Sequence, residues 1–453
     1  MRIAYFVQEY TPKIVGGLGT YAQHICPALV DLGHEVTIFT LNDGTLKTEE
    51  NIGGVEIHRP LTINMPQGVV DSLLPHDIHH WGIPGIILYN IFSASKFIDL
   101  IKKDKKHFDI IVVHDWLSGI AGMISENNIE LPLVFHLHST ERGRAMGTGN
   151  QTIASIELRT GDAATGIITV SFAMEEDIIN QGFDPRKITV CWNGVDTQKY
   201  DPKKVTDEER LAIRRKYQIE DDEKMLLFIG RLVPVKGVIE LVEAMTMIKD
   251  PKVKLVILGQ GGLEGTVANL ISQLDLTDKI KTCFEFVPEE ERIRHLAACD
   301  IAVFPSKYEP FGIVALEAMA MEKPVIVGAS GVSGLREIVV PSGDYWTGVH
   351  VNGQNPADIF GWGLKPLLSL STEELIEMGK RGRRRAEEYF TWTRIAKQTA
   401  EIYTQTIEIH KEHLLEKLEK TLDCVFTETN KGHKPIEKIA GCSGSFDNAV
   451  YKP

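Results

Sequence analysis

The sequence predicts an α/β protein with two Rossmann-like, doubly wound domains that face each other across a cleft, followed by C-terminal helices. Three observations predict this fold class. Short β-branched runs alternate with amphipathic stretches, runs such as 110–113 are continuously apolar, and the same alternation starts again near residue 224. Continuously apolar strands are typical of parallel sheets that are covered by helices on both faces.

The expected elements follow the chain in order. The strands of the first domain are predicted at 3–7, 35–41, 109–113, 132–137, 166–170 and 188–191, with helices at 21–32 and 91–102. Those of the second domain are predicted at 224–230, 254–259, 280–286, 301–305 and 324–327, and 371–422 is expected to be helical throughout. The polar stretch 196–223 marks a boundary, so we expect domains at 1–200 and 201–390, a helical segment at 391–425 and a polar tail at 426–453.

Composition and charge exclude several classes of protein. The 453 residues include 49 Lys and Arg against 62 Asp and Glu, a net charge of −13. This balance argues against a nucleic-acid partner, because such binding depends on neutralising phosphates, and more weakly against an anionic membrane. The sequence has no apolar stretch long enough to span a bilayer. Its six cysteines are scattered without a Cys-x-x-Cys pair, which indicates reduced thiols in a cytoplasmic protein without a zinc site.

A glycine-rich loop follows the first predicted strand. Gly16 and Gly17 stand at the start of a predicted helix, with Gly19 two residues further on. Glycines allow a ligand to approach the backbone closely, and a helix N-terminus offers N–H groups to an anion. The alternative is a tight turn that packs the helix on the sheet. The segment is neither a Gly-x-Gly-x-x-Gly dinucleotide motif nor a P-loop.

Two cations follow the first strand of the second domain. Arg231 and Lys236 lie five residues apart across a turn, and Lys236 is near the start of the next helix. Two cations beside a helix N-terminus would suit a diphosphate, although either could instead pair with a surface carboxylate.

Two carboxylates eight residues apart form the most specific motif. Glu309 follows the strand at 301–305, Pro310 and Gly312 shape the turn, and Glu317 lies just over one turn inside the helix that follows. A carboxylate at Glu317 can accept two hydroxyls of a ribose, and its apolar neighbours indicate that it needs a partner. The alternative is a solvated helix glutamate.

Histidines end a strand of the first domain. His136 and His138 share one face of this strand by spacing. His138 is expected to point into the cleft between the domains. The pair could bind a metal, but the sequence shows no third ligand, and a core or capping role is the alternative.

Together these motifs resemble the retaining glycosyltransferases of the GT-B fold, in the family 4/5-like group that includes glycogen synthase and sucrose synthase. The Glu-x7-Glu motif with the Arg/Lys pair is the specific part of the resemblance, which spans about residues 1 to 330 and extends through the helical C-terminus. The residues that carry it are Gly16-Gly17-Leu18-Gly19, His114-Asp115-Trp116, His138, Asn193-Gly194-Val195-Asp196, Arg231 with Lys236, and Glu309-Pro310-Phe311-Gly312 with Glu317.

The resemblance implies roles for these residues. His138, Arg231, Lys236 and Glu309 would be catalytic. The donor, a nucleotide-sugar, would be bound by Gly16, Gly17, Asn193, Arg231, Lys236, Glu309, Phe311, Gly312, Ile313 and Glu317, with the backbone of 311–313 contributing N–H groups. Asp115 would lie near the acceptor, and Trp116 would either stack on a glucan ring or fill the cleft wall.

The implied reaction moves glucose from ADP- or UDP-glucose to the non-reducing end of an α-1,4-glucan, with retention and as part of glycogen biosynthesis. No metal or other cofactor is expected, because the sequence has no Asp-x-Asp triplet and the two cations would stabilise the leaving diphosphate. The alternative acceptors are a small sugar, a sugar phosphate or a lipid-linked glycan. Other classes, a dinucleotide oxidoreductase or a non-catalytic sugar-binding protein, are disfavoured by these motifs. A homo-oligomer remains open.

Some features depart from the pattern or stay without a role. Bacterial glycogen synthases have a lysine two residues before the first glycine of the loop, where this chain has Ile14. This weakens the assignment of the acceptor but not of the reaction class. The loop with His76, His79 and His80 could contact a metal or a sugar, but a surface loop is the preferred interpretation.

Overall fold

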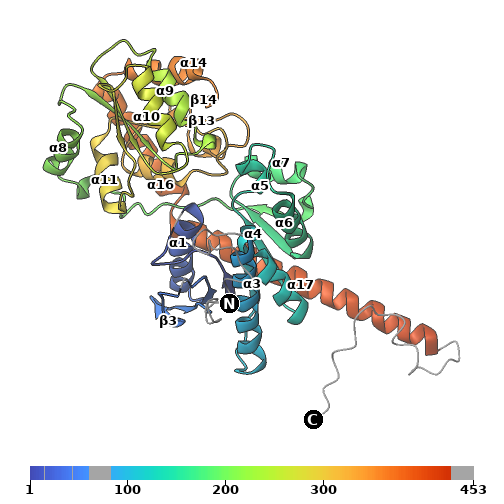
Figure 1. Ribbon diagram of the computed structural model, residues 1–453. Coiled ribbons are helices and arrows are strands. Elements are labelled where there is room, and N and C mark those ends of the chain that lie inside the picture. The colour runs from blue at the N-terminus through green and yellow to red at the C-terminus, as the bar shows by residue number, and fades with distance from the viewer. Residues whose placement is uncertain (15, 43, 61–82, 430–453) are drawn as a thin grey trace.

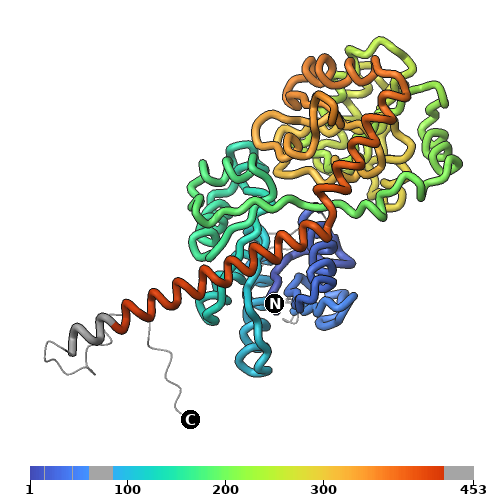
Figure 2. The backbone as a smooth tube through the Cα atoms, turned by 180° about the vertical axis from the view of Figure 1, so that it is seen from behind, coloured from blue at the N-terminus to red at the C-terminus, as the bar shows by residue number. Residues whose placement is uncertain are grey.

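The computed structural model describes residues 1–14, 16–42, 44–60 and 83–429. It consists of two α/β lobes, and a long C-terminal helix links the second lobe back to the first and projects beyond it (Figures 1 and 2). The loop with His76, His79 and His80 and the predicted tail from residue 430 lie outside the described residues.

The first domain is built on one sheet with the strand order β3-β4-β2-β1-β5-β6-β7-β8. All neighbours are parallel except β3 and β4. Its strands are β1 (Arg2–Phe6), β2 (Glu35–Phe39), β3 (Glu49–Ile52), β4 (Val55–His58), β5 (Ile110–His114), β6 (Leu133–Leu137), β7 (Gly166–Thr169) and β8 (Ile188–Val190). Its helices are α1 (Gly17–Asp31), α3 (Ile83–Lys102), α4 (Asp115–Asn128), α5 (Glu141–Arg144), α6 (Gln151–Ala163) and α7 (Phe172–Asn180).

The second domain has a parallel sheet with the order β11-β10-β9-β12-β13-β14. Its strands are β9 (Lys224–Ile229), β10 (Val253–Leu258), β11 (Ile280–Cys283), β12 (Ile301–Phe304), β13 (Val325–Gly328) and β14 (Gly348–Val351). Its longer helices are α8 (Asp207–Lys216), α9 (Val238–Met245), α10 (Glu264–Gln273), α11 (Glu289–Ala298), α12 (Ile313–Ala320) and α16 (Thr372–Tyr389). The two sheets confirm the predicted fold class.

Each sheet has one point where the strand order reverses. In the first domain the reversal lies between β1 and β5, and in the second between β9 and β12. Ligands of open parallel sheets bind beyond the carboxyl ends of the strands at such switch points. The glycine loop follows β1 and Arg231 follows β9, while Asp115 follows β5 and Glu309 follows β12. Four of the predicted site segments therefore lie at the two switch points.

The C-terminal helix α17 (Trp392–Thr429) belongs structurally to the first domain. Trp392 stacks on His24 with ring centroids 5.2 Å apart, and Tyr403 is fully buried in the core of the first domain. The expectation of an unbroken helix over 371–422 is wrong, because α16 ends at Tyr389. At the break, the Val195 N–H donates to the Phe390 carbonyl over 2.7 Å, so this carbonyl pairs with the segment that links the domains.

The sequence patterns do not predict three of the strands. β3 lies at the edge of its sheet and reads Glu-Glu-Asn-Ile, β4 alternates apolar and polar residues over only four positions, and β14 begins with a glycine. Such short or polar strands carry little periodicity, and their neighbours in the sheet decide their conformation.

Two further expectations concern membranes and cysteines. Among the described residues, no helix combines the length and the apolar character that crossing a bilayer requires. The thiols of Cys26, Cys191, Cys283 and Cys299 are free.

Candidate active site between the two domains

The cations predicted to bind a diphosphate lie in the loop at the carboxyl end of β9, a central strand of the second sheet. Arg231 follows β9 and is exposed, and its side chain makes no hydrogen bond or ion pair with any described residue. Lys236 is half-buried and forms an ion pair with the Glu309 carboxylate, which also accepts a 3.1 Å hydrogen bond from Ser306 Oγ. The expected alternative, pairing with a surface carboxylate, does not apply to Lys236, because its partner Glu309 is half-buried and belongs to the predicted site.

Two glycines allow the loops at this end of the sheet to pack closely against their neighbours. Gly237 has φ +69°, and a Cβ there would lie 2.1 Å from the Pro305 carbonyl oxygen. Gly312 has φ +109°, and a Cβ there would lie 2.3 Å from the side chain of Leu335. Both positions favour glycine for conformational and steric reasons. The turn at Gly312 starts α12 directly after the Glu309 loop, as predicted.

Glu317 is a buried residue of α12 with only 7% of its surface exposed, so the alternative of a solvated glutamate is wrong. Burial raises the pKa of its carboxyl, whereas the Arg292 guanidinium and the Tyr200 hydroxyl act in the opposite direction. Within the described part of the chain, no hydrogen bond or ion pair joins Glu317 or Arg231 to the pair of Lys236 and Glu309. These four residues thus share one domain, but only Lys236 and Glu309 are joined by a polar contact.

The glycine loop lies at the carboxyl end of β1, a central strand of the first sheet. Gly16 is the N-cap of α1, and its N–H donates to Glu9 Oε2 over 3.0 Å. A Cβ at Gly16 or Gly17 would meet no atom of the described residues within 4 Å, so these residues leave space beside both glycines. The fold itself therefore does not require glycine at these two positions, which leaves room for a ligand as the reason.

Asp115 organises the loop that carries His138. Its Oδ1 accepts the backbone N–H groups of His138, over 2.7 Å, and of Ser139, over 3.3 Å. Asp115 is buried and has φ +50°, a left-handed conformation that aspartate and asparagine tolerate better than other residues. Its carboxylate therefore stabilises the conformation of the loop through these two hydrogen bonds.

The other predicted site residues lie in different surroundings. Trp116 is buried against Ile86 and Ile153, so it fills a small apolar cluster, and a contact with acceptor stays a prediction. Phe311 packs in the core of the second domain and Ile313 packs partly against it, which leaves their backbone for the predicted role. Asn193 is buried, and its Oδ1 has no hydrogen-bond partner among the described residues.

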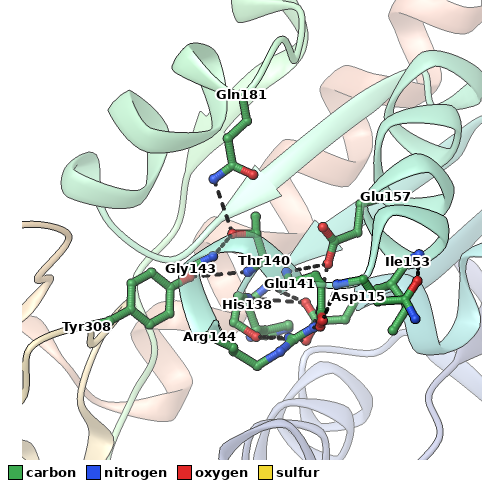
Figure 3. Close-up of polar contacts among 12 residues, drawn as sticks. Asp115, His138, Thr140, Glu141, Gly143, Arg144, Ile153, Glu157, Gln181 and Tyr308 are labelled. Carbon is green, nitrogen blue, oxygen red and sulfur yellow. Dashed lines mark hydrogen bonds and ion pairs between the residues drawn. The ribbon is translucent and has the colours of Figure 1, made fainter. Parts of the chain in front are cut away.

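Direct contacts hold the loops of the two domains together (Figure 3). The Tyr308 hydroxyl, next to Glu309, accepts the backbone N–H of Thr140 over 3.2 Å. Ser171 Oγ donates to the Pro310 carbonyl over 2.6 Å, and the Ala173 N–H donates to Glu337 Oε1 over 3.0 Å. The loop with His138 is thereby held against the loop with Glu309. The sequence patterns did not predict Tyr308, because its contact partner is 168 residues away.

A methyl group at Gly143 should force these loops apart, since a Cβ there would lie 2.2 Å from the Tyr308 ring. We expect Gly143→Ala to lower the free energy of unfolding by about 1–3 kcal/mol, as overpacking does. In a Tyr308→Ala background the same change should cost much less. Urea denaturation of the four proteins measures this coupling, and equal costs in both backgrounds would contradict it.

A buried carboxyl contacts the segment that follows His138. Glu157 on α6 is 1% exposed; its Oε1 accepts the Glu141 N–H over 2.9 Å and lies 3.6 Å from the Arg144 guanidinium. Burial raises the pKa of Glu157 to about 8 despite Arg144. The carboxyl is therefore mostly protonated at neutral pH in the folded protein.

The raised pKa of Glu157 makes stability depend on pH. The folded chain keeps a proton that the unfolded chain releases near pH 4.3, so stability falls as the pH rises toward about 8. Glu157→Gln keeps a neutral side chain and should gain on the order of 2 kcal/mol relative to the wild type between pH 5.5 and 8. Denaturation at both pH values measures this, with Asp162→Asn, an exposed position of the same helix, as the control. A constant difference would show that Glu157 does not titrate in this range.

Three histidines meet at the carboxyl ends of β5 and β6. The sequence showed no third ligand beside His136 and His138, but His114 supplies one, with ring nitrogen atoms of all three within 4.8 Å of one another. His114 and His136 are neighbours in the register of the two strands. The signal that could have found this is positional, because the ends of adjacent parallel strands meet at one edge.

Two such sheets, with cations and carboxylates at one switch point and an open glycine loop at the other, define the class of GT-B glycosyltransferases. Sequence comparison agrees: a model described as "Glycosyltransferase Family 4" matches residues 15–199, and "Glycosyl transferases group 1" matches 209–385. An uncharacterised glycosyltransferase of Methanocaldococcus jannaschii is 33% identical over 416 residues, covering 90% of this chain and 99% of its own. The chain belongs to the GT-B glycosyltransferases of the family 4 and 5 group and is a transferase.

More distant relatives differ in their named activities. A D-inositol 3-phosphate glycosyltransferase of Kineococcus radiotolerans is 28% identical, covering 87% of this chain and 91% of its own. A glycogen synthase of Mycobacterium tuberculosis is 28% identical, covering 89% and 94%. Among solved structures, the catalytic domain of starch synthase IV from Arabidopsis thaliana, bound to ADP and acarbose, is similar with a TM-score of 0.72 at 17% identity, covering 90% of this chain and 99% of that one. This last similarity concerns the fold.

Proposed function

We propose that the protein is a retaining hexosyltransferase that moves glucose from ADP- or UDP-glucose to the non-reducing end of an α-1,4-glucan in the cytoplasm. The observation that carries the proposal is the contact of Lys236 with Glu309 at the carboxyl end of the second sheet. Arg231 follows β9 at the same end, and its side chain makes no hydrogen bond or ion pair with any described residue. The Tyr308–Thr140 contact holds the His138 loop of the first domain beside this end. The relative named glycogen synthase supports the choice of acceptor.

In this proposal the chain's own cations replace a metal. Arg231 and Lys236 bind the diphosphate and stabilise the negative charge that develops as it leaves. Glu309 accepts hydrogen bonds from sugar hydroxyls, and its contact with Lys236 holds the two side chains together before the donor arrives. Glu317 binds the ribose. Retention by front-face attack requires the acceptor hydroxyl and the leaving phosphate to lie on the same side of the sugar, so positioning matters more than a strong base.

A small phosphorylated sugar is the second candidate acceptor. A cavity of about 400 Å³ lies between the domains, lined by Arg142 and Lys307 among others. Arg142 follows the His138 loop, and its side chain makes no hydrogen bond or ion pair within the described residues. A free guanidinium at a cavity of this size suits a phosphate group. The relative named D-inositol 3-phosphate glycosyltransferase is consistent with this candidate.

A matrix of donors against acceptors tests the proposal. ADP- and UDP-glucose are each incubated with an α-1,4-glucan, glucose, glucose 1-phosphate, inositol 3-phosphate and a lipid-linked glycan, and release of nucleoside diphosphate is measured. Release that depends on glucan supports the first candidate. Release that depends on a sugar phosphate and is lost in Arg142→Ala supports the second. Lack of acceptor-dependent release with every pair would contradict both.

Activity should survive removal of divalent cations. Because cationic side chains are proposed to stabilise the leaving group, treatment with EDTA should leave the rate within about twofold. The same assay measures this, with and without added Mg²⁺ or Mn²⁺. Loss of activity that only a divalent cation restores would overturn the metal-free reaction.

A further inference from the structure

The histidine cluster at the ends of β5 and β6 contains one direct hydrogen bond between two rings. His114 Nδ1 lies 3.0 Å from His138 Nε2, while His136 Nε2 lies 2.9 Å from the Tyr403 hydroxyl. His114 and His136 are buried, whereas His138 is half-buried at the end of the strand. The Tyr21 ring packs on His138 with centroids 4.7 Å apart. The hydrogen bond therefore joins an enclosed ring to one that borders the candidate site.

Burial determines the charge of these rings. It lowers the pKa of His114, His136 and His138, because a charged imidazolium loses its hydration in the interior. Each ring is therefore neutral near pH 7, with one N–H donor and one bare nitrogen acceptor. In a hydrogen bond between two neutral rings, either His114 or His138 can be the donor. The surroundings of the second nitrogen of each ring indicate which of them donates.

The second nitrogen of His114 gives the direction. Its Nε2 is buried and has no hydrogen-bond partner among the described residues. Buried N–H groups without a partner are rarer than buried acceptors without one, so the bare nitrogen of His114 is Nε2 and its proton is on Nδ1. The Nδ1–H then donates to His138 Nε2. Because that nitrogen is the acceptor, the proton of His138 resides on Nδ1.

We propose that His114 is a positioning residue that holds His138 in the neutral Nδ1–H form and so presents an N–H donor to the bound sugar. His138 Nδ1 makes no hydrogen bond with any described residue, which leaves it available to a ligand. Asp115 fixes the backbone of His138, and His114 fixes its ring. The role toward sugar rests on the proposed function, whereas the position of the proton does not.

A neutral donor suits the proposed reaction better than a charged one. Positive charge develops at the anomeric carbon during glycosyl transfer, and a nearby imidazolium would repel it. A neutral N–H can bind a sugar hydroxyl without this penalty. The enclosed His114 keeps the orientation of the donor while it adds no charge.

A metal ion is the competing interpretation of three neighbouring histidines. Zinc would need a bare nitrogen from each ring at about 2.0–2.1 Å, whereas a hydrogen bond across the 3.0 Å between His114 Nδ1 and His138 Nε2 needs a proton on one of these two nitrogens. A bound metal and this hydrogen bond therefore exclude each other. We infer the hydrogen-bonded pair, and metal content becomes an outcome of the test.

NMR of the complete, 15N-histidine-labelled chain tests the position of the proton without any substrate. Long-range 1H–15N correlations distinguish a protonated ring nitrogen from a bare one, and His138→Gln identifies the signals of His138. We expect a protonated Nδ1 and a bare Nε2 in His138 at pH 7. A protonated Nε2 in His138 would overturn the proposal, as would one metal ion per chain that is lost in His114→Phe.

Variants of His114 test its effect on activity. His114→Phe keeps a ring but removes the donor, so His138 should become a mixture of both forms and kcat should fall about tenfold or more, with a smaller change in the donor KM. His114→Asn places an N–H near the original Nδ1 and should restore kcat to within about threefold of the wild type. Tyr403→Phe, which alters only the neighbouring His136 contact, is the control.

The two readouts separate this proposal from the proposed function. If no donor and acceptor pair reacts but NMR shows the Nδ1–H form, the function fails while the assigned proton position stands. If transfer occurs but His114→Phe leaves both the NMR signals and kcat unchanged, the role of His114 fails while the function stands. If His114→Phe does not fold, His114→Asn and the wild-type spectrum still decide the question.

Discussion

Replacing Lys236 by alanine is expected to lower kcat about a hundredfold or more. In the structure, the Lys236 ammonium lies at the second switch point in contact with Glu309. In the proposed reaction, it stabilises charge that appears only as the diphosphate leaves, so its loss should affect the transition state more than the bound donor. The KM of the nucleotide-sugar should therefore change less than kcat, and steady-state kinetics measure both.

A matched control separates this chemical role from the loss of an ion pair. Lys254 pairs with Glu223 in the same domain, with side chains 15% and 13% exposed against 19% and 13% for Lys236 and Glu309. Lys254 is near the amino end of β10, away from the carboxyl edge. Lys254→Ala should lower stability to a similar extent but leave kcat nearly unchanged. A folded Lys236→Ala variant with kcat within about threefold of the wild type would remove Lys236 from the mechanism.

Replacing Asp115 by alanine should have the largest effect on stability. The carboxylate accepts the N–H groups of His138 and Ser139, and their loss leaves two half-buried donors without a partner. Each costs about 1–3 kcal/mol, and alanine is strained at φ +50°. We expect a loss of about 3–5 kcal/mol in the free energy of unfolding, together with a fall in kcat of about tenfold or more because the His138 loop is released.

Two variants divide the effect of Asp115 into its causes. Asp115→Asn retains an oxygen acceptor and tolerates the left-handed conformation, so it should cost much less. Asp275 is exposed and has φ +55°, so Asp275→Ala measures the conformational strain without the buried hydrogen bonds. Urea denaturation of all variants gives the comparison. If Asp115→Ala costs no more than Asp275→Ala, the two N–H contacts do not hold the loop.

Local patterns were sufficient for most of the fold. The apolar run 110–113 became β5, and the turn at Gly312 starts α12 as expected. These elements were predictable because their signals, apolar periodicity and turn chemistry, lie within a few residues. The patterns did not indicate β3, β4 and β14, which are short and partly polar, nor the break at Phe390.

The sequence predicted most residues of the candidate site but not the long-range contacts that hold them in place. Lys236 and Glu309 were each expected at a strand end, and their contact followed because both strand ends lie at one switch point. Long-range partners could not be predicted in this way. Tyr308 reaches Thr140 across the domains, and Glu157 is buried beneath the loop of His138.

Local sequence patterns are enough to predict two parallel-sheet domains and to place the chemistry-bearing residues after the strands. The contacts between these residues and the burial of each one become visible only in the folded chain. The tertiary structure paired Lys236 with Glu309, and it enclosed His114. Among the residues that the structure describes, neither the Arg231 side chain nor His114 Nε2 has a hydrogen-bond partner. The physical reason is that periodicity and turn residues act over a few positions, whereas desolvation and hydrogen bonding depend on neighbours that only the folded chain brings together.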